Sequence, residues 1–147
     1  MQSFSEFLLE SQQWGSGKSV RSKEEEMEVA KMSPIFKKFA LQGWTFEATI
    51  HAAAQAYDRR PGFELDDWKK MHRSVLEGIK KNKASDGEYL FFSTSADQAY
   101  IAAIKAKQKM VRIITVLPKG KSFPLPGTEK LIVEGVEFEL KQIIEVD

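Results

Sequence analysis

The sequence predicts an α+β fold in which a helical N-terminal half packs on a small split antiparallel β-sheet. Apolar residues follow a helical period in the first half, and runs rich in β-branched residues with period-two alternation follow from about residue 88. The 147 residues include 42% hydrophobic side chains, which suffices for one core. We therefore expect a helix and linker over residues 1–19 and one domain over 20–147, helical over 20–83 and mainly β over 88–147.

The first segment is amphipathic. Phe4, Phe7 and Leu8 fall on one side of a predicted helix over residues 3–13. The GSGKS that follows at 15–19 resembles the end of a phosphate-binding P-loop, but that motif requires a buried strand before it, and the preceding FLLES forms none. We interpret GSGKS as a linker.

Three helical patterns follow the linker. A polar helix begins at EEEM, and Pro34 forces a restart before a second short helix. Thr45 can cap a helix over FEATIHAAAQAY, which RRPGF ends. Asp66 and Asp67 begin the next helix, whose apolar face continues to Lys81.

The second half is mainly β in character. YLFFSTS (89–95) is a strand candidate, ADQAYIAAIKAK (96–107) a helix, and MVRIITVL (110–117) a strand rich in β-branched residues. A loop punctuated by prolines and glycines follows. EKLIV and VEFELKQIIEV then predict a hairpin around Glu134 and Gly135.

Charge and composition limit the function classes. Twenty-two basic against 21 acidic residues leave a net charge of +1, so no global field attracts the chain to nucleic acid or acidic membranes. There is no cysteine, which removes disulfides and thiolate chemistry. His51 and His72 leave little for a zinc site, and a hydrogen-bonded, partly buried histidine is the default for each.

The N-terminal segment does not read as a signal peptide. Glu6 and Glu10 interrupt it, and no apolar run approaches membrane-spanning length. We expect a cytoplasmic protein without membrane contact; for a chain of viral origin that compartment is the host cytoplasm.

One local basic segment stands out. Between Lys69 and Lys83 six basic residues accompany a single acid, Glu77, with Arg59 and Arg60 nearby. This face could meet the phosphates of a nucleic acid. A solvated helix face is the favoured interpretation, because no aromatic residues are interleaved as stacking platforms.

Two polar features in the second half gain meaning from their order. FSTS ends a strand, and Glu129 begins a later one before an apolar stretch, a turn glycine and an alternating strand. In this order the chain, over about residues 66–147, resembles the C-terminal half of ADP-ribosyltransferases of the Arg-Ser-Glu class, as in toxins and phage enzymes. The matching positions are Glu129, Leu131, Ile132, Gly135, Phe138 and Leu140.

The resemblance implies an ADP-ribosyltransferase-like fold and NAD as substrate, with no metal. Glu129 would stabilise an oxocarbenium-like transition state, and Ser93 would hold Glu129 and the sugar in position. Arg73 would anchor the pyrophosphate. Residues implied in NAD binding are Arg73, Phe92, Ser93, Thr94 and Ser95. The expected acceptor of ADP-ribose is a protein, with a nucleic acid as the other option, and simple NAD hydrolysis is also compatible.

The chain departs from the family pattern at two positions. The family places its arginine on a strand, whereas the helical period around Arg73 puts this residue on a helix, opposite the core. Gly127 stands where arginine-modifying members often carry Glu or Gln, so arginine is not a safe acceptor. A register with Glu137 and Glu139 as a Glu-x-Glu pair ranks second, because only eight residues follow it.

The alternative from another class is a catalytically silent α+β module that binds a protein, for instance a phage accessory protein acting on a host partner. A cation beside Ser93 in space would favour the enzyme, and only apolar or acidic neighbours would favour the module.

Overall fold

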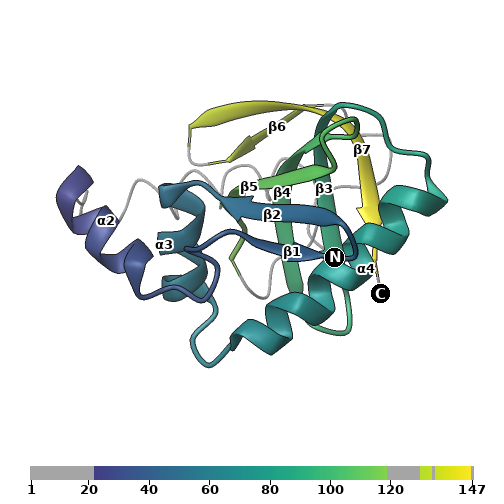
Figure 1. Ribbon diagram of the computed structural model, residues 1–147. Helices are drawn as coiled ribbons and strands as arrows, with labels where there is room; N and C mark the ends of the chain where they lie inside the picture. Colours follow the sequence, from purple (N-terminus) through teal and green to yellow (C-terminus); the bar gives the residue numbers. More distant parts are fainter. Residues whose placement is uncertain (1–21, 119–129, 134, 147) are drawn as a thin grey trace.

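The computed structural model describes residues 22–118, 130–133 and 135–146. This part of the chain contains three helices and seven strands (Figure 1). In order they are α2 (Lys23–Lys31), β1 (Phe39–Leu41), β2 (Trp44–Ala48), α3 (Ile50–Arg59), α4 (Leu65–Lys81), β3 (Gly87–Ser93), β4 (Gln98–Lys105), β5 (Met110–Val116), β6 (Lys130–Val133) and β7 (Val136–Glu145). The predicted helix over 3–13 and the GSGKS linker lie outside the described residues.

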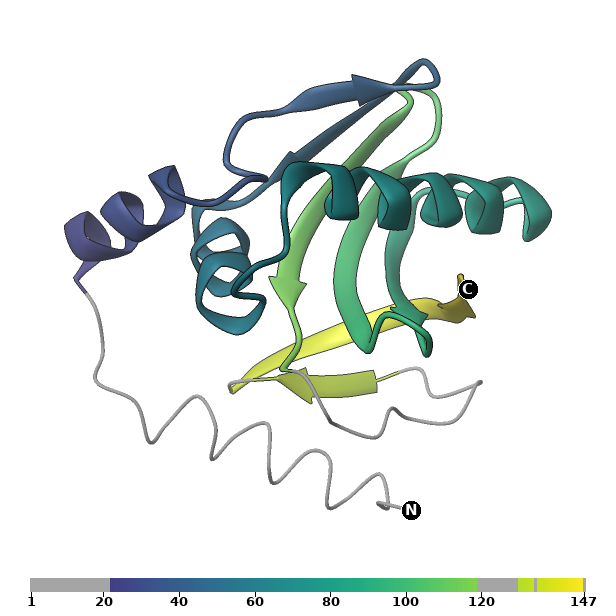
Figure 2. The same ribbon diagram turned by 90° about the horizontal axis from the view of Figure 1, so that it is seen from below.

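The strands form one mixed sheet in the order β1-β2-β5-β4-β3-β7-β6. Neighbouring strands are antiparallel except for the parallel pairs β2–β5 and β3–β7. Helix α4 lies across the strands, α3 lies beside it, and α2 packs on the outer side of α3 (Figure 2). The α+β class is therefore confirmed, but the sheet is neither split nor purely antiparallel.

Two apolar clusters occupy the two faces of the sheet. The first lies under the helices and joins Trp68, Val75 and Leu76 of α4 to Phe91 and Tyr100 of the sheet. The second lies on the opposite face, with these buried members: Leu90, Ala99, Ile101, Leu117, Leu131, Val133, Phe138, Leu140 and Ile143. Because side chains alternate along a strand, β3 and β4 contribute to both clusters.

Local side-chain hydrogen bonds fix where each helix begins. Ser22 accepts the backbone N–H of Glu25 at the start of α2, and Thr49 accepts that of Ala52 at the start of α3. At the start of α4 the Glu64 backbone N–H donates to Asp67 Oδ2 at 2.8 Å. The predicted helix from Asp66 and Asp67 to Lys81 is confirmed.

The N-terminal half is less helical than predicted. The segment after Pro34 forms turns and then strand β1 instead of a second helix. Thr45 lies in β2, pairing with Met110 of β5, and the helix cap is Thr49. The predicted cap was wrong because β2 is short and only Phe46 within it is buried. A single buried residue gives no alternation of buried and exposed positions by which the sequence could mark a strand.

The predicted helix over residues 96–107 was also wrong, because Gln98–Lys105 is strand β4. Its alanines have high helix propensity, which suggested a helix. Strand β4 is the central strand of the sheet and has apolar layers on both faces, so it carries apolar residues on both sides in place of alternation. Packing overrode propensity here.

The remaining β predictions hold. YLFFSTS forms β3, which ends at Ser93, and MVRIITVL forms β5. Strands β6 and β7 make the predicted antiparallel hairpin, with Val133 opposite Val136. Gly135 has φ 79°, a left-handed conformation that glycine adopts without strain.

Candidate functional site

Ser93 ends strand β3 and begins the turn into β4. Its side chain is buried, and its Oγ accepts the backbone N–H of Ala96 at 3.1 Å. The Ser95 Oγ lies 3.4 Å away. Thr94 is exposed and donates to Glu145 Oε1 at 3.3 Å. Phe92 packs into the apolar cluster on the other face of the sheet, away from Ser93.

A cavity of about 270 Å³ lies between α4 and this turn. Its lining includes Phe63, Asp67, Lys70, Ser74, Ser93 and Ser95. Thus a cation, Lys70, shares a cavity with two hydroxyls of the Ser-Thr-Ser motif. The acid in the lining, Asp67, already accepts the backbone N–H of Glu64.

The arginine expected to anchor NAD, Arg73, lies apart from this cavity, and a different arginine contacts the turn. Arg73 is exposed on α4, as its helical period predicted, and does not line the cavity. Arg60 instead holds the turn, donating to the carbonyls of Ala96 (2.8 Å) and Asp97 (2.6 Å). Burial lowers the pKa of the Arg60 guanidinium, and the charge of Asp97 partly offsets this. Arg60 is therefore a fixed positive charge beside the turn.

Glu129 and Gly127 lie outside the described residues. The next residue along, Lys130, pairs with Glu139 of β7, whereas Phe92 pairs with Glu145 of the same strand. These positions are six residues apart, or about 20 Å of extended chain. Lys130 and Ser93 thus belong to distant parts of the sheet.

The second-ranked pair of acids, Glu137 and Glu139, is exposed on β7. Lys130 Nζ approaches Glu137 Oε1 at 3.8 Å. Both carboxylates therefore face solvent near the β6–β7 hairpin.

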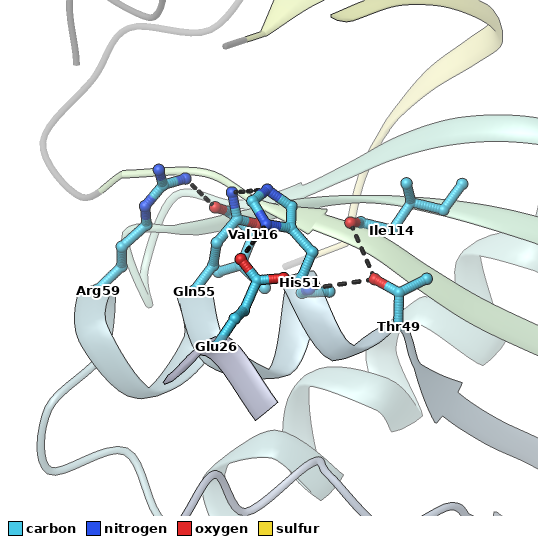
Figure 3. Close-up of polar contacts among 8 residues, drawn as sticks. Glu26, Thr49, His51, Gln55, Arg59, Ile114 and Val116 are labelled. Carbon is cyan, nitrogen blue, oxygen red and sulfur yellow. Dashed lines mark hydrogen bonds and ion pairs between the residues drawn. The ribbon is translucent and has the colours of Figure 1, made fainter. Parts of the chain in front are cut away.

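A second group of polar side chains lies along α3, where sequence reasoning placed no site. His51, Gln55 and Arg59 follow one another at intervals of four residues, so they share one side of the helix. This side faces the end of β5 (Figure 3). Thr49 anchors the start of the helix to the same strand, with its Oγ1 3.4 Å from the Ile114 carbonyl.

Gln55 connects β5 to His51. The Val116 backbone N–H donates to Gln55 Oε1 at 2.9 Å, so the amide oxygen must face the strand. The amide nitrogen then faces His51 Nε2, also at 2.9 Å. Because this nitrogen can only donate, the neutral imidazole must accept at Nε2 and carry its proton on Nδ1.

Glu26 of α2 completes the arrangement. Its Oε2 lies 3.1 Å from His51 Nδ1, the ring nitrogen that carries the proton. The His51 side chain is 49% exposed, whereas Gln55 is buried. A histidine held between a carboxylate and an amide, with its ring open to solvent, is suited to proton transfer.

Arg59 closes the row at the far end of α3. It is buried and donates from Nη1 to the Val116 carbonyl at 2.6 Å. The two peptide groups of Val116 are thus both bonded to α3, one to Gln55 and one to Arg59. These two bonds attach α3 to the end of β5.

His72 contrasts with His51. It is fully buried, stacks on Phe46 at 4.3 Å between ring centroids, and its Nδ1 lies 2.9 Å from the Tyr100 hydroxyl. Burial lowers its pKa to about 3. The expectation of a buried, hydrogen-bonded histidine is confirmed for His72.

No protein family, curated protein or solved structure matches this chain. Over the residues described, no cluster of three or more His, Asp or Glu side chains is arranged to hold a metal ion. No helix in the same ranges has the length and apolar character needed to cross a membrane.

Proposed function

We propose that the protein is an RNA-cleaving enzyme in which His51 acts as the general base. The observation that carries this proposal is the tautomer of His51. Gln55 and Glu26 together hold the neutral ring with its proton on Nδ1 and its Nε2 lone pair accepting the Gln55 amide. Since the ring is half-exposed, a substrate hydroxyl can replace the Gln55 amide at Nε2.

The chemistry around His51 favours RNA among phosphate esters. The Thr49 hydroxyl at the start of α3 accepts the Ala52 N–H and contacts the Ile114 carbonyl, so it is poorly placed as a nucleophile. RNA brings its own nucleophile, the 2′-hydroxyl. A base beside the substrate is then sufficient to begin the reaction.

The proposed step conserves atoms and charge. His51 Nε2 takes the proton of the 2′-hydroxyl, the oxygen attacks phosphorus, and the bond from phosphorus to the 5′-oxygen breaks. The leaving oxygen takes that proton back from the imidazolium, directly or through a water molecule, which restores neutral His51 and gives a 2′,3′-cyclic phosphate and a 5′-hydroxyl end. The positive end of α3, whose second residue is His51, favours the phosphate.

The test uses a labelled random-sequence RNA 20-mer and its all-2′-deoxy counterpart. We expect RNA fragments ending in 2′,3′-cyclic phosphate, identified by mass spectrometry, and no cleavage of the deoxy strand. Cleavage of the deoxy strand, or fragments ending in a 3′-hydroxyl, would assign the reaction to another mechanism. Intact RNA after prolonged incubation would overturn the proposal.

ADP-ribosyl transfer from NAD, or NAD hydrolysis, is a second candidate. The observation that favours it is Lys70, a cation in the same cavity as Ser93 and Ser95. A lysine can balance the pyrophosphate charge, although without the bidentate geometry of an arginine. In this candidate Lys70 takes the role that the sequence resemblance gave to Arg73, and Glu129 remains the proposed carboxylate.

This candidate predicts release of nicotinamide when the protein is incubated with NAD and cell lysate. Lys70→Ala should weaken NAD binding about tenfold, and Glu129→Gln should abolish release, whereas Arg73→Ala should leave binding unchanged. Equal loss in Arg73→Ala would restore Arg73 as the anchor. Absence of nicotinamide release together with intact RNA would favour the protein-binding module.

A further inference from the structure

We infer that the end of the sheet where β5 begins binds the phosphate backbone of a single-stranded nucleic acid. Seven exposed lysines lie at this end of the sheet, which we call the lysine end: Lys80, Lys81, Lys83, Lys105, Lys107, Lys109 and Lys141. They come from three stretches of the chain. The predicted basic face over 69–83 includes only the first three.

Backbone pairing brings the three stretches together. Strand β4 ends beside the start of β3, with Ile104 opposite Gly87, and turns into β5 with Lys105 opposite Met110. The backbone N–H of Ala106 donates to Asp86 Oδ1 at 2.9 Å, which joins the β4–β5 turn to the segment after α4.

Strand β7 reaches the same place. Lys141 Nζ donates to Ser85 Oγ at 3.1 Å, and its side chain packs over Gly87. The lysines of α4, of the β4–β5 turn and of β7 therefore surround one end of the molecule.

The local charge at this end is positive although the whole chain is nearly neutral. The acids of the adjoining segments are Glu77, Asp86, Glu88, Glu139 and Glu145, the last of which lines one cavity with Lys81, so seven lysines accompany five carboxylates. Asp86 is engaged with Ala106, and the stretch from Lys105 to Met110 contains no acid. A polyanion at the β4–β5 turn therefore meets three lysines and one carboxylate, that of Asp86.

The side chains favour a nucleic acid over an acidic membrane. The large apolar side chains that are exposed in the described residues are Met32, Ile50, Tyr57, Leu65 and Val136. None of them belongs to the lysine end, whereas surfaces that bind membranes usually add apolar side chains to the basic ones. Lysines bind phosphates as point charges and carry no base preference.

The lysine end lies at a distance from His51 that suits it to hold the substrate strand. This role rests on the proposed function of RNA cleavage. Strand β5 runs from Met110 at the lysine end to Val116 at the His51 site, a length of about 20 Å. A short single-stranded segment spans this length. The lysine end would hold the strand while a neighbouring phosphodiester lies at His51.

Binding is tested with a single-stranded all-2′-deoxy 20-mer, which lacks the 2′-hydroxyl and so binds without being cleaved. The triple variant K105Q/K107Q/K109Q should bind at least tenfold more weakly at 0.1 M salt, an estimate for losing three phosphate contacts. Its slope of log affinity against log salt should be shallower by about 2. The control K23Q/K37Q/K38Q removes the same charge from exposed lysines elsewhere and should keep the wild-type slope.

Equal losses in the two triple variants would show that only net charge matters and would overturn the inference. Affinity without salt dependence in the wild type would do the same. Vesicles with anionic lipid serve as a second probe: binding to vesicles that the K105Q/K107Q/K109Q change abolishes, with unchanged binding to the oligonucleotide, would assign the surface to membranes. A protein that binds the oligonucleotide as expected but leaves RNA intact would retain this surface and lose the proposed function.

Discussion

Replacing His51 by alanine is expected to lower the rate of RNA cleavage by about a thousandfold, the range in which a general base contributes. The folded state should tolerate the change, because the ring is half-exposed and contributes little to either apolar cluster. Initial rates on a labelled RNA with a single cleavage site provide the measurement. A His51→Ala protein with an unchanged thermal midpoint and wild-type rate would remove His51 from the mechanism.

Gln55 positions the His51 ring, so a substitution of Gln55 tests the role of His51 without removing the imidazole. In Gln55→Glu one carboxylate oxygen still accepts the Val116 N–H, but the other now faces His51 Nε2 and requires a proton there. The ring then has no lone pair at Nε2, so kcat should fall at least 100-fold while KM changes little.

Glu26→Gln should lower kcat less, by about tenfold, because an amide oxygen can still accept the Nδ1 proton. Glu24→Gln removes the same charge from an exposed position of α2 and should have no effect. Similar losses in Glu26→Gln and Glu24→Gln would show that the charge of α2, and not the contact with His51, is responsible.

Acidification from pH 7 to pH 4 is expected to lower the free energy of unfolding through His72 alone by about 3 kcal/mol. The unfolded chain takes up a proton on this residue near its ordinary pKa of 6.5, whereas burial lowers the pKa in the folded state to about 3. Between these values only the unfolded state binds the proton, so the stability falls as the pH falls. Urea unfolding at several pH values measures the effect.

His72→Phe should remove this part of the pH dependence. Phenylalanine can keep the stacking with Phe39 and Phe46, but it leaves the Tyr100 hydroxyl without its partner, at a cost of about 1–2 kcal/mol at pH 7. If the variant and the wild type lose equal stability on acidification, other groups cause the acid sensitivity.

The elements with a strong periodic signal could be predicted from the sequence. Helix α4 has an apolar face over its full length, and β5 is rich in β-branched residues, so local pattern and final structure agree. Strands β2 and β4 escaped prediction because their pairing partners decide their conformation. The alanines of β4 fit a central strand that is covered on both faces, which no local window reveals.

The candidate site escaped prediction for a related reason. The spacing of His51, Gln55 and Arg59 along α3 is visible in the sequence, but it is a weak signal by itself. The site forms only when these residues meet partners that are distant along the chain. Glu26 lies 25 residues from His51 in the sequence, and Val116 lies 61 residues from Gln55. The position of Ser93 at the end of β3 was predicted, since it follows directly from a strand boundary.

The hydrogen bond from Val116 to Gln55 has a consequence for how this protein tolerates sequence drift. The donor that orients the whole row is a peptide N–H, so any residue except proline at position 116 supplies it. The side chain there is free to vary with the apolar core, while Gln55 has no equivalent substitute. Homologues that share the proposed chemistry are therefore expected to vary at position 116 among apolar residues, to exclude proline there, and to retain glutamine at position 55.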